Sequence, residues 1–522
     1  MTDDRLPAAD RSLPEVVAWW ARRTPDAPAL LGPGIDPVSF AELAAVMASV
    51  SRELRSLGVS PQDRVILLVP DDAVASALLL GVAGAAVAVA LNPRAAAPEL
   101  EALGERLRPR LTIASGAGLE HADRLGAPVL RVEGVDPRHV RFSPYSTSPS
   151  SSPVQTACFA QPDDLSVVLA TSGTTSVPRL VPLTHRNLIT ASANFARVAG
   201  LGTGDIALNL GSLFHILHLG IALPALLTGG ASYVPSDRQP ESLWRALNHC
   251  GITWLMGTPA HYSLLCEGGM KRFGSRTRGS LRLAISAAAP LSAELSASLA
   301  DALAARVLNL YGMSESPFLA MTPPGREVQP DSLGFALCEG LDIVDLDGQA
   351  VAVGTTGEIV TRGAHVFPGY LDDPTATAAA FLPGGWFRTG DSGYFDENGV
   401  LFLTGRLSEI INRGGEKVAP ADIDAALLAH PDVAEAAAFG IPDRRLGEEV
   451  AAVVVLRPGS RATERELRRS VANRLAPHKI PRRIWFVGEL PRTATGKVQR
   501  GELARRFRFA RSESLSSGTP GG

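Results

Sequence analysis

The chain has 522 residues, of which 45% are hydrophobic and 20% charged, and its formal net charge is −3. This length predicts about three domains, and the hydrophobic content is that of an ordinary soluble globular protein. The nearly balanced charge argues against a nucleic-acid-binding protein. The acidic N-terminus has no apolar run typical of a secretory signal. The four scattered cysteines, which have neither metal-site spacing nor disulfide density, favour a reducing, cytoplasmic location; they are Cys158, Cys250, Cys266 and Cys338.

The first hundred or so residues alternate between helical and strand-like patterns. We expect amphipathic helices at Val16–Arg23 and Ala41–Leu57, and a buried strand at Arg64–Val69. A helix at Pro98–Leu107 and a strand at Leu111–Ile113 follow. Short apolar runs that alternate with helices indicate a parallel α/β sheet.

Val74–Leu91 is a run of 18 residues without a charge, which is long enough for a membrane span. The run is mostly Ala, Gly and Val, is broken at Gly84, and has no flanking aromatic belt. We therefore expect a buried helix up to Gly84 and a buried strand at Ala86–Leu91, and no membrane span.

The rest of the chain divides by composition. Residues 143–157 are Ser/Pro-rich and predict a flexible surface excursion. The α/β alternation resumes at 165, and a Gly-rich, strand-rich stretch covers 333–404. A small α+β unit of about 100 residues begins at Gly405, and we expect domains at 1–404 and 405–510 and a disordered tail at 511–522. The predicted elements of this α+β unit are helices at Ala421–Leu428 and Glu464–Leu475 and strands at Ala434–Phe439, Val450–Leu456 and Arg483–Val487.

The most informative segment is a small-residue loop after the apolar strand Val167–Ala170. Thr171–Ser176 consists of hydroxyl residues and one glycine, and Arg179 follows. Hydroxyl and backbone N–H groups in such a loop can hold phosphate oxygens, while Gly173 allows close approach of the backbone. The alternative is a Ser/Thr-rich surface turn. No Gly-Lys-Ser/Thr follows, so the loop is not a Walker loop.

This loop resembles the Thr-Ser-Gly-Thr-Thr-Gly-x-Pro-Lys signature of the adenylate-forming (AMP-binding) superfamily, with Ser176, Arg179 and Leu180 as departures. Further motifs also resemble those of the family and occur in the same order, across roughly residues 12–505. Within the superfamily, the motif sequences are most similar to those of the acyl-CoA synthetases of the oxalate–CoA ligase branch. These motifs are 286–291 (SAAAPL), 309–315 (NLYGMSE), 386–391 (WFRTGD) with 405–417 (GRLSEIINRGGEK), and 491–497 (PRTATGK).

The resemblance implies an α/β fold: a large N-terminal domain of two α/β subdomains plus a β-barrel, and a small mobile α+β C-terminal domain. It also implies ATP, Mg²⁺ and CoA as cofactors and substrates. Glu315 would bind the metal, since Mg²⁺ is usually held by carboxylate and phosphate oxygens, and Asp391 would clamp the ribose. The nucleotide-binding set that it implies is Thr171, Ser172, Gly173, Thr174, Thr175, Arg179, Ala288, Asn309, Tyr311, Ser314, Asp391 and Arg406.

The resemblance implies that Lys497, one of only four lysines, is catalytic together with Glu315 and His215. A mobile ammonium would stabilise the charge that grows on the α-phosphate during adenylation. Ser408 stands at the family's hinge position, where Asp or Lys is usual. Taken singly, these residues have plainer interpretations: a solvated lysine, a capping serine at 314, a turn residue at 391 and an interior histidine at 215.

The acyl pocket that the resemblance implies lies along 214–219, 254–258, 287–289 and 312–314, with Ser286, His215 and His218 as polar candidates. No arginine in these segments could pair a second carboxylate, which weakens an assignment to oxalate. The sequence predicts an ATP-dependent ligase that joins a small carboxylic acid to CoA through an acyl-adenylate. Two alternatives stay open, an enzyme that loads a carrier protein or an amine and a non-catalytic nucleotide-binding relative.

Overall fold

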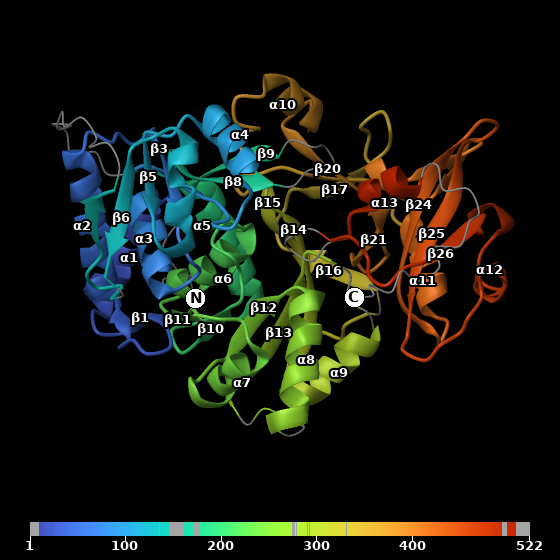
Figure 1. Cartoon of the computed structure of the whole chain (residues 1–522), viewed down its shortest axis with the longest axis horizontal. Helices are drawn as coiled ribbons and strands as arrows, with labels where there is room; N and C mark the ends of the chain where they lie inside the picture. Colours follow the sequence, from blue (N-terminus) through green and yellow to red (C-terminus); the bar gives the residue numbers. More distant parts are fainter. Residues whose placement is uncertain are drawn as a thin grey trace, which may run out of the picture. The chain divides into compact units, whose positions relative to one another are not determined.

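The computed structural model describes residues 10–134, 136–145, 160–171, 178–273, 277, 279–289, 291, 293–329, 331–492 and 498–507. The chain forms two compact units, which are considered one at a time (Figure 1). The large unit comprises Met1–Leu341, Thr361–Phe387 and Gly399–Leu401. The small unit comprises Asp342–Val360, Arg388–Asn398 and Phe402–Gly522.

The large unit contains a seven-stranded sheet with the strand order β7-β6-β5-β3-β4-β8-β9. Its five central strands run parallel, and the outer strands β7 and β9 are antiparallel to their neighbours. The parallel strands are joined through helices, as a parallel sheet requires. The elements are β3 (Arg64–Leu68), α3 (Ala73–Ala83), β4 (Val87–Ala90), α4 (Ala97–Leu107), β5 (Leu111–Ala114), η1 (Gly116–Glu120), η2 (Ala122–Leu125), β6 (Val129–Glu133), β7 (Arg141–Pro144), β8 (Leu165–Thr171) and β9 (Arg179–Thr184).

A second sheet in the large unit has the order β16-β15-β14-β13-β12-β10-β11-β1-β2, with β14 through β1 parallel. Its strands are β1 (Pro28–Leu31), β2 (Val38–Ser39), β10 (Ile206–Asn209), β11 (Ala231–Tyr233), β12 (Trp254–Gly257), β13 (Leu283–Ala287), β14 (Arg306–Met313), β15 (Ser316–Met321) and β16 (Ser332–Ala336). The remaining elements of the large unit are α1 (Leu13–Arg23), α2 (Phe40–Ser56), α5 (His185–Ala199), α6 (Ile216–Leu227), α7 (Pro240–His249), α8 (Pro259–Phe273), α9 (Ala293–Leu303), α10 (Pro374–Ala380) and β19 (Phe381–Leu382).

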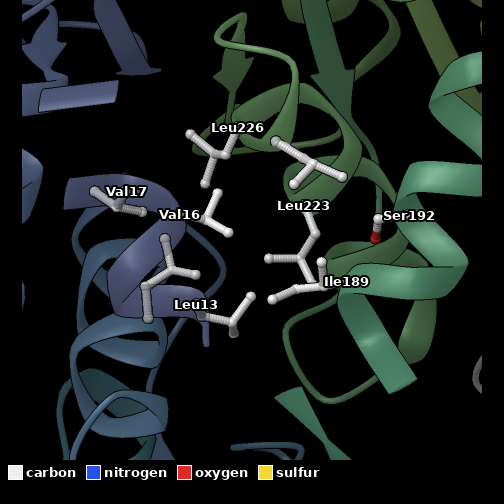
Figure 2. A pocket seen from close by; sticks show the side chains of 9 residues that line it. Leu13, Val16, Val17, Ile189, Ser192, Leu223 and Leu226 are labelled. Atoms are coloured by element: carbon white, nitrogen blue, oxygen red, sulfur yellow. The ribbon is translucent and has the colours of Figure 1, made fainter. Parts of the chain in front are cut away.

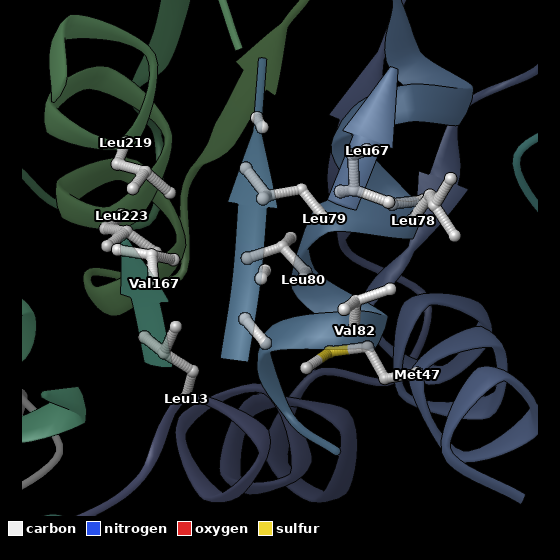
Figure 3. Close-up of a cluster of buried hydrophobic side chains, with 14 of the residues drawn as sticks. Leu13, Met47, Leu67, Leu78, Leu79, Leu80, Val82, Val167, Leu219 and Leu223 are labelled. Carbon is white, nitrogen blue, oxygen red and sulfur yellow. The ribbon is translucent and has the colours of Figure 1, made fainter. Parts of the chain in front are cut away.

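The uncharged run at 74–91 is interior structure. All residues of α3 except Val74 are buried, which is the pattern of a helix inside a core. Figure 3 shows Val82 of α3 beside Met47 of α2 within the main apolar cluster. No helix in the described ranges is long and apolar enough to cross a membrane.

Helices α1, α5 and α6 meet in a tightly packed apolar contact. Figure 2 shows Leu13 and Val16 of α1 facing Ile189 and Leu223. The space that they leave has a volume of about 10 Å³, which is the lower limit for a single water molecule. This contact stabilises the large unit and leaves no room for a ligand.

The small unit has a sheet with the order β23-β22-β25-β24, and β26 pairs with β25. One face of the long β24–β25 pair packs against α11 and α12 and the other against α13, so both faces are apolar. Its elements are β17 (Leu341–Val344), β18 (Gly357–Thr361), β20 (Trp386–Phe395), β21 (Leu401–Arg406), η3 (Leu407–Glu409), β22 (Ile411–Arg413), β23 (Glu416–Val418), α11 (Pro420–Leu428), β24 (Val433–Asp443), β25 (Gly447–Leu456), α12 (Glu464–Ala472), η4 (Pro477–Lys479), β26 (Arg483–Phe486) and α13 (Arg500–Phe507); β17, β18, β20 and β21 include a few residues of the large unit.

The predicted α/β class is confirmed, and the predicted elements differ mainly at their ends. β24 extends to Asp443 because it pairs with β25 through ten register positions. The helix that begins at Glu464 ends at Ala472, three residues earlier than predicted. The excursion predicted at 143–157 starts too early, since Ser143 and Pro144 pair with β6. Residues 146–157 and the predicted tail lie outside the described residues.

Candidate active site

Three of the predicted nucleotide-binding residues lie at one edge of the second sheet. β13 and β14 run parallel with Ser286 opposite Asn309. Ala288 follows the carboxyl end of β13, where it is exposed and has φ of +71°. Tyr311 lies two residues after Asn309 on β14 and is buried. Ligands bind at the carboxyl ends of strands in open α/β sheets, and a non-glycine residue at positive φ is a strain typical of functional sites.

The predicted phosphate loop joins two paired strands. β8 and β9 are antiparallel, and Thr171 pairs with Arg179 at the end of the ladder. The Thr171 hydroxyl donates to the Arg179 carbonyl over 3.3 Å. The two residues therefore mark the base of the loop between them. The predicted loop residues Ser172, Gly173, Thr174 and Thr175 lie outside the described residues.

Arg179 and Glu315, which are 136 positions apart in the sequence, are connected through Tyr370. The Arg179 Nη1 donates to the Tyr370 hydroxyl over 3.2 Å, and this hydroxyl donates to the Glu315 Oε1 over 3.0 Å. The Arg179 guanidinium also lies 5.0 Å from the centre of the Tyr370 ring. The structure thus joins the predicted phosphate-binding cation to the predicted metal-binding carboxylate.

Tyr370 was not predicted from the sequence as a site residue. Burial and, to a smaller degree, the neighbouring Glu315 carboxylate raise its pKa to about 12, against the opposing effect of Arg179. The phenol therefore keeps its proton and can hold Glu315 in place. The available sequence signal was a lone tyrosine between Gly369 and the Asp373-Pro374 helix start, which by itself indicates a turn.

Ser314 and Glu315 form the tip between β14 and β15, where Met313 pairs with Ser316. The backbone is fixed by a hydrogen bond from the Phe367 N–H to the Glu315 carbonyl over 2.9 Å. Among the residues that the structure describes, no three His, Cys, Asp or Glu side chains form a metal-binding group. A single carboxylate with substrate phosphates is a usual Mg²⁺ environment, so Glu315 fits this metal.

His215 begins α6 and is largely enclosed. Its Nδ1 accepts the Leu217 N–H over 3.2 Å as the cap of the helix, and burial lowers its pKa. His261, in α8, has its pKa lowered to about 4 by burial, and to a smaller degree by the charges of Arg238 and His215. These histidines are neutral near pH 7, which suits a gate or a wall better than an acid catalyst.

An arginine from outside the predicted pocket segments lies beside them. Arg238 Nη1 and Nη2 both donate to Asp71 Oδ2 over 3.1 Å. Its Nε donates to the Leu210 carbonyl over 3.0 Å and Nη2 to the Gly211 carbonyl over 2.9 Å. The Gly211 carbonyl oxygen also lies 3.3 Å from Nδ1 of the buried His218. Arg238 is thus largely committed to Asp71 and the strand-end carbonyls.

Two predicted site residues of the small unit form an ion pair. Arg406 Nε donates to Asp391 Oδ1 over 2.8 Å. Asp391 is buried, and its backbone N–H donates to the Thr389 hydroxyl over 3.1 Å. β20 and β21 bring the two residues together although they lie 15 positions apart. A carboxylate oriented in this way is a suitable acceptor for ribose hydroxyls.

The remaining catalytic prediction, Lys497, lies outside the described residues. The hinge prediction, Ser408, is exposed within η3. On the two sides of the lysine segment, Arg492 and Val498 form an antiparallel bridge. The role of Lys497 stays a prediction.

Comparison with known proteins decides the family. The AMP-binding enzyme model matches residues 17–371, and the AMP-binding enzyme C-terminal domain model matches residues 422–497. The chain belongs to the AMP-binding enzyme family.

The relatives of this AMP-binding enzyme are CoA ligases. It is 35% identical over 496 residues to a probable CoA ligase, CCL9, from Humulus lupulus, covering 92% of this chain and 94% of the relative. It is 33% identical over 502 residues to the oxalate–CoA ligase of Arabidopsis thaliana, covering 93% and 97%. ATP-bound MatB from Rhodopseudomonas palustris has a TM-score of 0.85 at 27% identity, covering 96% of this chain and 99% of MatB.

These similarities confirm the predicted family, fold class and enzyme class. The chain is an acid–thiol ligase of the AMP-binding family, as predicted from its motifs. The predicted binding of ATP fits the ATP-bound structural relative. The roles of the individual site residues stay predictions.

Proposed function

We propose that this AMP-binding enzyme joins a small carboxylic acid to CoA in two half-reactions. In the first, a carboxylate oxygen attacks the α-phosphorus of ATP, the bond to the β-phosphate oxygen breaks, and pyrophosphate leaves. In the second, the CoA thiolate attacks the acyl carbon of the acyl-adenylate. The bond between that carbon and the phosphate oxygen breaks, and AMP leaves with the oxygen.

The contact chain from Arg179 through Tyr370 to Glu315 carries this proposal for the large unit. It holds a cation and a carboxylate together, as binding of a triphosphate and its metal requires. Glu315 would hold Mg²⁺, which when bound neutralises charge on the phosphate oxygens. Thr171–Thr175 and Arg179 would hold the phosphates. Ala288, Asn309 and Tyr311 would contact the adenine at the carboxyl edge of the sheet.

The small unit would supply the ribose clamp and the mobile cation. Arg406 orients the Asp391 carboxylate, whose oxygens would accept the two ribose hydroxyls. Lys497 would place its ammonium between the carboxylate and the α-phosphate during adenylation, where the charge develops.

The surroundings of His215 favour an acid whose acyl group is uncharged. Arg238, the cation beside this region, is already paired with Asp71 and with two carbonyls. Burial disfavours the charged form of His261. A second carboxylate, as in oxalate, would therefore displace an existing ion pair to be bound. We infer that monocarboxylic acids are better substrates than oxalate.

Two alternative functions can be distinguished from this proposal. In the first, a carrier protein or an amine, and not the CoA thiol, accepts the acyl group. A non-catalytic nucleotide-binding protein would bind ATP without releasing pyrophosphate. The ion-paired Asp391 and the connected Glu315 argue against the non-catalytic alternative, since binding alone does not require a metal-positioning carboxylate. In the described part of the chain, the half-buried Cys250, Cys266 and Cys338 form no disulfide, which fits the proposed cytoplasmic location.

Pyrophosphate release across a panel of acids, with and without CoA, tests the proposal. The panel contains short aliphatic and aromatic monocarboxylic acids and oxalate. We expect about one equivalent of pyrophosphate per enzyme without CoA, multiple turnovers with CoA, and slower reaction with oxalate. Tight ATP binding without pyrophosphate release from any acid would support the non-catalytic alternative. Turnover with a carrier protein or an amine, but not with CoA, would show that CoA is not the acyl acceptor.

A further inference from the structure

The small unit contains a largely buried cluster formed by Arg500, Glu409 and Asp424. Arg500 Nε donates to Glu409 Oε2 over 3.0 Å, and Nη2 donates to Asp424 Oδ2 over 2.6 Å. Nη1 donates to the Ala438 carbonyl over 3.0 Å. Asp424 Oδ1 in turn accepts the Ala438 N–H over 2.6 Å. Each guanidinium nitrogen therefore has an acceptor, and the cluster joins three helical elements to β24.

The cluster is enclosed enough for its geometry to be specific. The side chains of Arg500, Glu409 and Asp424 are 19%, 23% and 13% exposed. Enclosed ion pairs add little net stability because desolvation offsets the attraction, but they can fix one arrangement of the elements that they join. The planar arginine fork makes that arrangement directional.

The three positions connect the two functional segments of the small unit. Glu409 is the last residue of η3 and directly follows Ser408, the predicted hinge. Arg500 is the first residue of α13 and lies three positions after Lys497. The hydrogen bond from Gln499 N–H to the Pro491 carbonyl, over 2.8 Å, fixes the chain just before α13. Ninety-one positions separate Glu409 from Arg500, so the ion pair is the direct link between them.

We propose that Arg500 is a positioning residue that ties the hinge turn, Leu407–Glu409, to the start of α13. A dihedral change at Ser408 then moves Glu409 and α13 as one body, and Lys497 lies three positions before α13 in the sequence. This inference rests on the proposed function, because it assigns Lys497 to the adenylation step. A displacement of a catalytic group by about 1 Å can cost up to about a hundredfold in rate, so a loosened link should slow adenylation without weakening ATP binding.

Glu409→Ala tests the link while leaving the Arg500–Asp424 pair in place. Glu502→Ala is the matched control, because Glu502 forms an exposed pair with Arg505 on the same helix. We expect Glu409→Ala to lower the kcat of adenylation about tenfold, with the KM for ATP and the rate of thioester formation from supplied acyl-adenylate both within about twofold of wild type. Glu409→Gln keeps an acceptor for Arg500 and should recover most of the rate. Glu502→Ala should match wild type.

A double-mutant cycle separates this role from general stabilisation. If the link is the cause, Arg500→Met combined with Glu409→Ala adenylates no more slowly than Arg500→Met alone. Additive losses, equal losses in both half-reactions, or an adenylation kcat for Glu409→Ala equal to that of Glu502→Ala would each overturn the proposal.

Hydrogen exchange keeps this inference separate from the proposed function. If wild-type enzyme releases no pyrophosphate with any acid, the proposed function fails, and exchange in the peptide covering 405–413 decides the link. Faster exchange there in Glu409→Ala than in Glu502→Ala supports the tie between the hinge turn and α13. Identical exchange in the two variants refutes it.

Discussion

The two units bury titratable groups in different ways. The large unit encloses His185, His218, His261 and His365, whose pKa values burial lowers to about 4. The small unit has only half-buried histidines, His430 and His478, and its enclosed charges are arginine–carboxylate pairs at Arg406, Arg413 and Arg500, of the kind that Arg238 and Asp71 form in the large unit. A neutral buried ring needs no counter-ion, whereas an enclosed arginine–carboxylate pair fixes the direction of the segments that it joins. Neutral buried histidines and enclosed ion pairs are expected to differ in how their contribution to stability depends on pH.

Acidification should reveal the difference between the two units most strongly. Each of the four histidines has a pKa lowered from 6.5 to about 4, which corresponds to roughly 3 kcal/mol. The unfolded chain binds more protons in this window, so the stabilisation is present above pH 6.5 and is lost as the pH falls toward 4. Together the four groups approach the roughly 5–15 kcal/mol of a typical domain. We therefore expect the large unit to unfold between pH 6.5 and 4.

One largely buried carboxyl of the small unit, Asp424, should respond in the opposite direction. Burial raises the pKa of Asp424 from 3.8 to about 6, against the effect of Arg500. The folded state then binds the extra proton, so this group lowers the free energy of unfolding as the pH rises from about 4 to 6. Pulse proteolysis at pH 7.5 and 5, with fragments assigned to each unit by mass spectrometry, measures both effects. Equal loss of protection in the two units would contradict the contrast.

Substitution of the predicted mobile cation should have the next largest effect. We expect Lys497→Ala to reduce acyl-adenylate formation by at least about a hundredfold, the scale of losing one transition-state donor. Thioester formation from supplied acyl-adenylate should fall much less, because the lysine serves the first half-reaction. Lys479→Ala is the control, since Lys479 pairs with Asp422 elsewhere in the small unit. Equal losses in the two half-reactions would show that Lys497 acts through structure.

The smallest predicted effect concerns Tyr370 in the large unit. Tyr370→Phe removes the hydroxyl that connects Arg179 to Glu315 while keeping the ring beneath the guanidinium. Loss of a hydrogen bond to a charged group costs about 1.5–3 kcal/mol, so the KM for MgATP should rise about tenfold or more. Tyr394→Phe is the control, because that ring stacks on Phe402 in the small unit. An unchanged dependence on MgATP would remove Tyr370 from the site.

Candidate site residues could be predicted from the sequence where they lie within short contiguous motifs. Glu315, Asp391 and Arg406 were predicted because they lie within short motifs that resemble those of the AMP-binding superfamily. Tyr370, Arg238 and Arg500 were not predicted, because their side-chain partners lie 55 to 191 positions away, and one sequence carries no signal of such pairing. Strand ends were misplaced for a related reason, since β24 owes its length to its partner β25.

Transfer of ¹⁸O from labelled carboxylic acid to AMP tests the central claim most directly. If the acid forms an acyl-adenylate and CoA then attacks its acyl carbon, one carboxylate oxygen stays on phosphorus. In a single turnover with ATP and CoA, mass spectrometry should therefore find one ¹⁸O in AMP, none in pyrophosphate, and one in the thioester carbonyl. Label in inorganic phosphate with ADP as the nucleotide product would demand an acyl phosphate instead, and thioester formation without label in AMP would contradict the adenylate mechanism.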